Sequence, residues 1–288
     1  FLKSFKKNGY KAIGIDPAKN ISKIANKNGI HTLPMFFNEK NSKLIKKKYG
    51  QAGLIFARNV IPHVENIHSI FKGVKNLLNR DGTFIIEFHY SNKFLKELHY
   101  DSIYHEHIFY FSLMTLINAL KKYSLFPYDV FKSPISGGSL VLFFNFNKRK
   151  ISTNLKNLLK NEKISEINSL KSWKKFSKSS QAHSKKFLDK LKKIKLKNNL
   201  FGYGASARSS TLLNYSKIDN KLIDFIIDKN FLKNSKYTAG SKIKIISPRN
   251  AQKKIEKYQY CVLLAWNFKK EIIADLKKLP KTIKVYNV

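Results

Sequence analysis

One stretch near the carboxyl end limits the fold more than any other part of the sequence. Leu200–Ala205 (LFGYGA) is an apolar strand that runs into a glycine turn, and a helix opens directly after it. A second apolar segment, Ile223–Asp228, ends on an acid roughly 20 residues further on. This order of elements is typical of a dinucleotide-binding Rossmann fold. The sequence therefore predicts an α/β domain over residues 199–288, with a third strand at Tyr260–Ala265.

The first half of the chain also alternates short apolar strands with amphipathic helices, which predicts an open α/β sheet. We expect its last two strands to form an antiparallel pair joined through Gly137-Gly138. The chain begins with Phe1 in what reads as the middle of a helix, so we expect the start of this domain to be missing. The predicted strands are Lys11–Asp16, Leu54–Phe56 (buried), Thr83–Phe88, Tyr128–Lys132 and Ser139–Asn145, the helices are Ile21–Asn28, Ile67–Asn79 and Leu113–Tyr123, and a turn falls at Asp81-Gly82.

Residues 148–198 have a different composition, rich in Lys and Ser, with apolar residues at helical spacing. This pattern predicts one or two amphipathic helices. A basic amphipathic helix can lie on a membrane surface, but it more often connects and packs on a neighbouring domain, and we favour the connector. The predicted domains are therefore residues 1–147, a helical linker over 148–198, and residues 199–288.

The formal net charge of +38 is extreme for 288 residues. A polyanion-binding protein would be one explanation. The basic residues are spread along the whole chain, however, and Lys dominates over Arg beside abundant Asn, Ile, Phe and Tyr, which is the pattern of an AT-rich genome. We therefore expect no nucleic-acid partner, although a positive field favours an anionic substrate such as a nucleotide diphosphate.

A single cysteine, Cys261, excludes an internal disulfide and a Cys-rich zinc site within this chain. No apolar run approaches the ~18–20 residues of a membrane span, and no signal-peptide pattern is present. We expect a cytoplasmic protein with no membrane partner.

The run Tyr104-His105-Glu106-His107 is dense in titratable side chains. Its spacing does not match the helical H-E-x-x-H of zinc proteases, so we expect no metal here. Histidine can accept a proton near neutral pH, and a tyrosine hydroxyl can donate a hydrogen bond to a developing enolate oxygen. On these residues alone, a catalytic cluster and an ordinary polar loop both remain open.

Three further candidates lie where predicted strands end. Asp16 could accept hydrogen bonds from ribose hydroxyls, and His63 follows the strand at Leu54–Phe56, although surface or capping roles would explain both. The turn Gly202–Arg208 could let the backbone approach a diphosphate, with Arg208 adding charge. That pattern alone does not choose between NAD and a nucleotide-sugar.

Taken together, these residues resemble the sugar C-methyltransferases that use S-adenosylmethionine and act on nucleotide-linked deoxysugars. The pieces run in order over nearly the whole chain, and the Tyr-His-Glu-His run and the Ala-Trp-Asn near the end are the specific ones. They are Gly14 through Pro17, Asn59 through His63, Glu87 through Tyr90, Asp101 through Ser112 (DSIYHEHIFYFS), Gly137 through Leu140, Gly202 through Asn214 (GYGASARSSTLLN), Asp228, and Leu264 through Phe268.

The resemblance implies a class I, Rossmann-like methyltransferase domain, truncated at its N-terminus, and a second Rossmann-like domain joined to it by a helical linker. Members of the family carry zinc in an N-terminal region and have a first glycine loop, and we expect both to be missing here. Arg208-Ser209 stands where the family usually has Lys-Gly, which can change the ligand geometry. The implied site residues are His107 as general base, Tyr104, Glu106 and His63 in the sugar pocket, Asp16 and Asn59 for S-adenosylmethionine, and Gly202, Tyr203, Gly204, Arg208 and Asp228 for the nucleotide-sugar.

The implied reaction begins with a nucleotide-diphosphate keto-deoxysugar whose ketone acidifies the neighbouring C–H. His107 would remove that proton, Tyr104 or His63 would stabilise the enolate oxygen, and the carbon would attack the sulfonium methyl. Three alternatives stay open: an NAD-dependent oxidoreductase built on Gly202–Asp228, a non-enzymatic polyanion-binding protein, and a methyltransferase for another acceptor.

Overall fold

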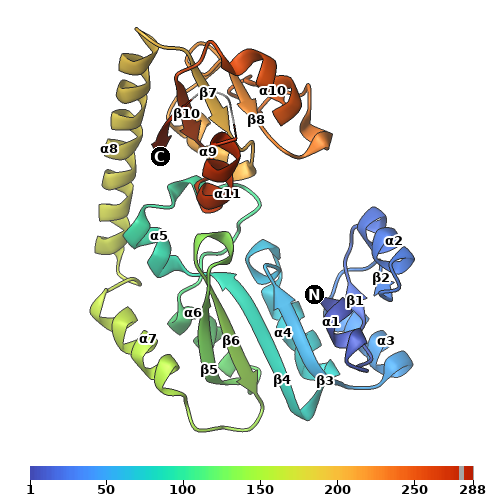
Figure 1. Cartoon of the computed structure of the whole chain (residues 1–288). Helices are drawn as coiled ribbons and strands as arrows, with labels where there is room; N and C mark the ends of the chain where they lie inside the picture. The colour runs from blue at the N-terminus through green and yellow to red at the C-terminus, as the bar shows by residue number, and fades with distance from the viewer. Residues whose placement is uncertain (279–281, 288) are drawn as a thin grey trace. The chain divides into compact units, whose positions relative to one another are not determined.

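The structure is a computed structural model that describes residues 1–278 and 282–287. By their internal contacts these residues form two compact units (Figure 1). Unit 1 consists of Phe1–His89, Phe111–Pro134 and Ser139–Ile164, and unit 2 consists of Tyr90–Tyr110, Ile135–Gly138 and the remainder from Ser165 onward. The units thus differ from the predicted domains, because Tyr90–Tyr110 and Ile135–Gly138 make their contacts with the carboxyl-terminal part of the chain.

Unit 1 contains two separate sheets where the sequence predicts one. A four-stranded sheet has the order β3 (Ala52–Arg58), β4 (Leu78–His89), β6 (Ser139–Asn145) and β5 (Phe126–Ser133). Strands β3 and β4 are parallel, whereas β6 pairs antiparallel with β4 and β5, which confirms the predicted antiparallel pair. The short strands β1 (Gly14–Ile15) and β2 (Thr32–Leu33) pair only with each other, in parallel.

Strand β4 forms the centre of unit 1. Its side chains Phe84, Ile86 and Phe88 are fully buried, since β4 has a paired strand on both sides and helices pack against the sheet.

The predicted helices at 21–28, 67–79 and 113–123 are all present. The helices of unit 1 are α1 (Leu2–Lys7), α2 (Lys19–Lys27), α3 (Glu39–Tyr49), η1 (Ile61–His63), α4 (Ile67–Leu77), α6 (Leu113–Lys121) and α7 (Thr153–Ile164).

Two local expectations in unit 1 need correction. Asp81-Gly82 is not a turn between two elements, because both residues belong to β4, at an irregularity where the register against β3 jumps from Ala52↔Leu78 to Leu54↔Thr83. The side-chain amide of Asn145 donates to the Gly82 carbonyl there at 2.7 Å. Strand β3 is not fully buried, because it lies at an edge of the four-stranded sheet and Leu54 keeps 41% of its surface exposed.

Unit 2 is built on a parallel sheet of five strands, which confirms the predicted Rossmann-like domain. The order is β11 (Lys284–Asn287), β10 (Tyr260–Leu263), β7 (Leu200–Tyr203), β8 (Phe225–Ile227) and β9 (Lys244–Ile246). The strand order reverses between β7 and β10, which makes the carboxyl ends of these two strands the topological switch point of the sheet.

The helices of unit 2 are α5 (Ser91–Glu97), η2 (Tyr100–Ser102), η3 (Ile135–Gly137), α8 (Leu170–Lys195), α9 (Ala207–Tyr215), η4 (Phe231–Lys233), α10 (Pro248–Ile255), η5 (Trp266–Phe268) and α11 (Lys269–Leu276).

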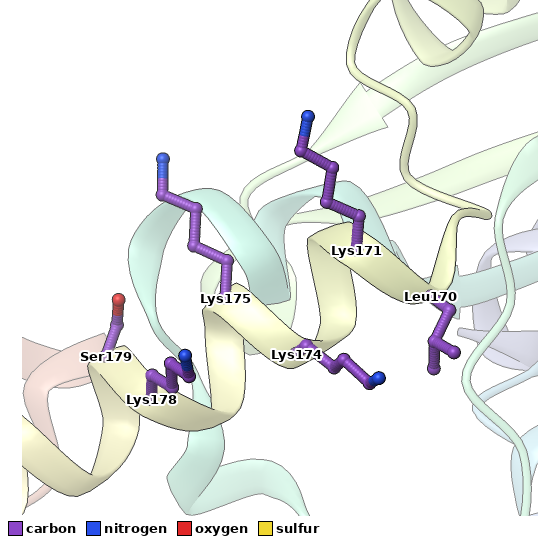
Figure 2. Close-up of a pocket in the computed structure, with 6 residues that line it drawn as sticks. All are labelled: Leu170, Lys171, Lys174, Lys175, Lys178 and Ser179. Carbon is purple, nitrogen blue, oxygen red and sulfur yellow. The ribbon is translucent and has the colours of Figure 1, made fainter.

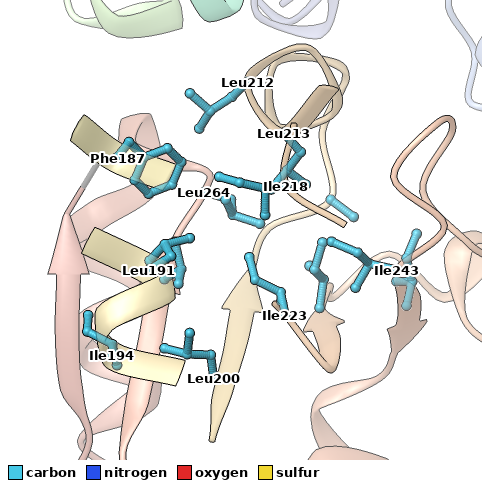
Figure 3. Close-up of a cluster of buried hydrophobic side chains, with 14 of the residues drawn as sticks. Phe187, Leu191, Ile194, Leu200, Leu212, Leu213, Ile218, Ile223, Ile243 and Leu264 are labelled. Atoms are coloured by element: carbon cyan, nitrogen blue, oxygen red, sulfur yellow. The ribbon is translucent and has the colours of Figure 1, made fainter. Parts of the chain in front are cut away.

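Both faces of the unit 2 sheet are buried, as expected for parallel strands. On one face, Phe187, Leu191 and Ile194 of α8 pack with Leu212 and Leu213 of α9 (Figure 3). On the other face, alternate strand residues such as Phe201, Cys261 and Leu263 pack with residues of α10 and α11. The predicted linker is therefore two helices, of which α7 belongs to unit 1 and α8 packs on the carboxyl-terminal domain. Within the described part of the chain, no helix is both long and apolar enough to span a membrane.

Candidate functional site

The imidazole of His107 is held in a defined orientation inside unit 2. Its Nδ1 lies 2.7 Å from the backbone carbonyl oxygen of Ser102. A carbonyl can only accept a hydrogen bond, so Nδ1 carries the proton and the neutral ring has its lone pair on Nε2. The hydroxyl of Tyr104 lies 3.2 Å from Nε2 and can donate to it. The arrangement provides a basic nitrogen next to a phenol.

The surroundings of this pair are half-buried. Tyr104 and His107 are both partly exposed, whereas His105 and Glu106 are exposed. Burial raises the pKa of Tyr104, and the negative charge of Glu106 raises it further. The Tyr104 hydroxyl therefore stays protonated at neutral pH and remains a hydrogen-bond donor. The ring of Tyr110 meets the ring of His107 edge-on, with centroids 6.2 Å apart.

Asp101 is the most heavily bonded side chain close to this pair. It is 5% exposed, and its carboxylate accepts two hydrogen bonds from the Arg208 guanidinium, each at 3.0 Å. The Trp266 indole N–H donates to the same carboxylate at 2.9 Å. The guanidinium also lies over the Trp266 ring at 4.3 Å, in cation–π geometry. Arg208 therefore binds a carboxylate of its own chain.

The ring of Trp266 connects two sequence features that lie far apart in the chain, Gly137 of the Gly-Gly pair and the Ala-Trp-Asn run. A Cβ on Gly137 would collide with the Trp266 ring, and φ is +82° at that residue. The buried ring of His99 lies 4.5 Å from the Trp266 ring. Burial, and then the positive charge of Arg208, lower the pKa of His99 to about 4. Sequence reasoning missed His99, since a histidine between apolar residues gives no local signal.

The glycine turn after β7 is filled by contacts within unit 2. A Cβ on Gly204, where φ is +95°, would collide with Ala265, and one on Gly202 would lie 2.8 Å from Leu264 Cδ1. The carboxylate of Asp228 accepts from the Ala205 backbone N–H at 2.8 Å. The buried Tyr203 donates its hydroxyl to Asp275 at 3.0 Å. Close packing inside the unit thus accounts for both glycines without a dinucleotide.

The remaining predicted site residues lie in unit 1. Asp16 follows β1 and is half-buried, and its Oδ1 accepts from the Ala18 backbone N–H at 2.8 Å. Asn59 follows β3 with φ at +49°, and its backbone N–H donates to the Glu87 carbonyl at 3.0 Å. His63 ends η1 and is exposed. Asp16, Asn59 and His63 therefore belong to one unit, and Tyr104, Glu106 and His107 belong to the other.

A buried acid at the end of β4 was also missed as a separate feature. Glu87 is 3% exposed, and its carboxylate pairs with Arg58 Nε at 2.9 Å and accepts from the Ser133 hydroxyl at 3.2 Å. These bonds tie together the carboxyl ends of β3 and β4 and the end of β5. The contact explains the conspicuous acid that closes an otherwise apolar strand.

An open hollow of about 540 Å³ lies along α8 (Figure 2). Its lining side chains all come from the first part of that helix, and none belongs to the predicted site. Four of the six are cationic, which favours small anions but defines no pocket for a sugar. The lining residues are Leu170, Lys171, Lys174, Lys175, Lys178 and Ser179. Among the described residues, no group of three or more His, Cys, Asp or Glu is arranged to hold a metal ion.

Several known proteins are similar to this chain. C-methyltransferase NovU of Streptomyces niveus is 30% identical over 280 residues, which are 96% of this chain and 66% of that protein. This chain therefore spans slightly less than two thirds of the length of that relative. Among solved structures, the PH0226 protein of Pyrococcus horikoshii is 15% identical with a TM-score of 0.37 and covers 50% of this chain and 76% of its own. The 1,6-didemethyltoxoflavin-N1-methyltransferase of Burkholderia thailandensis is 16% identical with a TM-score of 0.37, over 52% of this chain and 66% of its own.

The family matches divide the chain in two. Residues 1–125 match the family described as a methyltransferase domain, which confirms the predicted Rossmann-like methyltransferase fold for this part. Residues 134–283, just over half of the chain, match the family described as the C-methyltransferase C-terminal domain. This chain therefore belongs to the C-methyltransferase family.

Proposed function

We propose that this protein transfers the methyl group of S-adenosylmethionine to a carbon next to the ketone of a nucleotide-diphosphate keto-deoxysugar. The observation that supports this most directly is the orientation of His107. Its Nδ1–H donates to the Ser102 carbonyl, and its basic Nε2 is turned toward the Tyr104 hydroxyl. A base and a phenol side by side are what enolate formation requires.

In the proposed reaction the substrate ketone acidifies the adjacent C–H, and His107 Nε2 takes that proton. The hydroxyl of Tyr104 then turns from Nε2 to the enolate oxygen and donates a hydrogen bond to it. The raised pKa of Tyr104 supports this role, because the phenol keeps its proton at neutral pH. The electron pair of the broken C–H bond would form the new bond to the methyl carbon while the methyl–sulfur bond breaks, and its electron pair would stay on sulfur in the departing thioether, S-adenosylhomocysteine. Glu106 is proposed as a sugar-binding residue of unit 2, and His63 is proposed as a sugar-binding residue of unit 1.

Asp16 and Asn59 are the residues we propose for the methyl donor. Bound S-adenosylmethionine would supply an electrophilic methyl on a sulfonium. Asp16 fits its ribose, since Oδ1 is engaged by Ala18 and, among the described residues, no hydrogen-bond donor is paired with Oδ2. Asn59 stands at the carboxyl end of β3, the edge at which open α/β sheets bind ligands.

For the nucleotide part of the substrate we propose the loop Gly202–Arg208, with Tyr203, Gly204 and Asp228. Support comes from its position at the carboxyl ends of β7 and β8. The side chains of Tyr203, Arg208 and Asp228 already have partners in unit 2. The backbone N–H groups of Gly204 and Ala205 also have acceptors, the Ile227 carbonyl and the Asp228 carboxylate. The loop would therefore contribute the positive end of α9 more than these side chains.

The test is the variant His107→Gln, which keeps a side chain of similar polarity but removes the base. We expect methyl transfer to a keto-sugar nucleotide to fall by at least about 100-fold. Calorimetric binding of S-adenosylmethionine should stay unchanged, because Asp16 and Asn59 are intact. The matched control is His105→Gln, which alters an exposed histidine of the same run. Wild-type turnover in His107→Gln would rule out the base role, and transfer only to ketones without a nucleotide would rule out the substrate class.

A further inference from the structure

We infer that Asp101, Arg208 and Trp266 are positioning residues that hold His107 in its reactive tautomer through the Ser102 carbonyl. The chemical meaning of this inference rests on the proposed function, but its geometry does not. We call the three side chains the Asp101 clamp. None of the three is proposed to touch the reacting atoms.

The Asp101 clamp is built around a buried ion pair. The side chains of Asp101 and Arg208 are only 6% and 13% exposed, and their two hydrogen bonds form a bidentate ion pair. Trp266 completes the coordination of the carboxylate with its N–H and covers the guanidinium with its ring. Breaking one partner of such a pair leaves a buried charge uncompensated. The clamp therefore fixes Asp101 to α9 and η5.

The Asp101 clamp lies next to the residue whose carbonyl binds His107. Asp101 is the middle residue of η2, and its neighbours are fixed as well. The hydroxyl of Tyr100 lies 2.9 Å from His183 Nδ1 on α8, and Ser102 is fully buried. The Ser102 carbonyl is therefore a rigid acceptor, and it is the group that forces the proton of His107 onto Nδ1. Loosening Asp101 would release the carbonyl that selects the tautomer.

Two members of the Asp101 clamp lie just beyond the carboxyl ends of neighbouring strands. Arg208 lies in the first turn of α9 directly beyond β7, and Trp266 follows β10. The carboxyl ends of these neighbouring strands form the switch point, where open α/β sheets usually bind an external ligand. In unit 2 the side chains of Arg208 and Trp266 beside this edge bind the carboxylate of Asp101. The carboxyl-terminal domain thus holds the segment that carries the base.

The experiment follows the histidine tautomer in the whole chain by NMR, with ¹⁵N-labelled histidine and His107→Gln to assign the signal. In the wild type we expect a protonated Nδ1 and an unprotonated Nε2 at neutral pH. Asp101→Asn should give a mixture of tautomers, and so should Trp266→Phe, which keeps an aromatic ring but loses the indole N–H. The matched control is Asp224→Asn, which removes a carboxylate paired with Lys195 at 2.6 Å elsewhere in unit 2 and should leave His107 unchanged.

Enzyme kinetics provide the second readout. A displaced base should lower kcat roughly 10- to 100-fold, while KM should stay within about twofold because no ligand contact is lost. A wild-type tautomer and wild-type kcat in folded Trp266→Phe and Asp101→Asn would overturn the inference. If Asp101→Asn does not fold, Trp266→Phe decides alone. A tautomer shift in a chain that transfers no methyl group would support the clamp and contradict the proposed function.

Discussion

At the scale of single residues, His99 shows how burial sets protonation in unit 2. Its side chain is 4% exposed and packs against Trp266, and the Arg208 guanidinium is nearby. Both effects disfavour the imidazolium, so the folded protein holds His99 neutral down to a pKa of about 4. An unfolded histidine titrates near 6.5. Folding is therefore linked to proton release at His99.

This linkage predicts a loss of stability in mild acid. Between pH 6.5 and 4 the unfolded chain binds more protons at His99 than the folded chain, so the free energy of unfolding decreases as pH falls through this window. The contribution is fully present above pH 6.5 and is smaller at pH 5 by on the order of 2 kcal/mol. Urea unfolding at pH 7.5 and pH 5.0 would measure it. His99→Gln should reduce the pH dependence, the exposed-site control His31→Gln should not, and equal pH dependence in all three proteins would refute the linkage.

Site residues that are close in sequence could be paired by sequence reasoning, and distant ones could not. Tyr104 and His107 are close in sequence, so a local pattern was enough to pair them. Asp101 and Arg208 are separated by 107 residues, and nothing local marks them as partners. The sequence assigned Arg208 to a ligand because a cation at a helix start is typical of phosphate binding. Its observed partner depends on the path of the chain between the two units.

At the scale of elements, long amphipathic helices were predictable, and short strands were predictable where a glycine turn or an acid marked their ends. Helices such as α4 and α8 have a sustained apolar face. Strands β7 and β8 have four and three residues, but the glycine turn and Asp228 that follow them indicated both. Strands β9 and β11 are equally short without such a marker, and both were missed. Hydrogen bonds between elements could not be predicted from the sequence either. The buried Glu162 of α7 accepts from the backbone N–H groups of Leu113 and, at 3.0 Å, Met114, and so caps α6 from outside.

This external cap predicts a specific loss of stability. Glu162→Ala would leave two N–H groups at the start of α6 without their acceptor in a buried position. We expect the free energy of unfolding to fall by about 1–3 kcal/mol, measured by chemical denaturation at neutral pH. Asn161→Ala changes the exposed neighbour on the same helix and should have an effect within about 0.5 kcal/mol. Equal effects of the two substitutions would show that the cap contributes nothing.

At the scale of the whole molecule, the charge of +38 has to be reconciled with membership of an enzyme family. Lysines crowd the hollow along α8, but others are equally dense elsewhere, for example on α3. A charge spread in this way attracts polyanions without recognising any of them. The sequence analysis attributed the charge to codon usage, and this remains a prediction.

Binding to duplex DNA, measured by fluorescence anisotropy, tests whether the charge recognises a polyanion specifically. We expect weak binding that depends on charge alone and whose affinity falls at least about 100-fold between 50 and 200 mM salt. A variant with Lys171, Lys174, Lys175 and Lys178 changed to Glu should lose no more affinity than one with Lys43, Lys46, Lys47 and Lys48 of α3 changed to Glu. A selective loss in the α8 variant would instead identify that helix as a polyanion-binding surface.

Both units are assembled from several separate segments of the chain, which limits how the gene can recombine. The polypeptide passes from one unit to the other five times, at residues 89/90, 110/111, 134/135, 138/139 and 164/165. A gene fragment ending near residue 147 would encode Tyr104 and His107 but neither Arg208 nor Trp266. Exchange of either half by recombination would therefore combine the base and Asp101 from one ancestor with Arg208 and Trp266 from another. We expect the two halves to evolve as a single inherited block, and hybrids of distant relatives to recover activity only when Asp101, Arg208 and Trp266 come from the same parent.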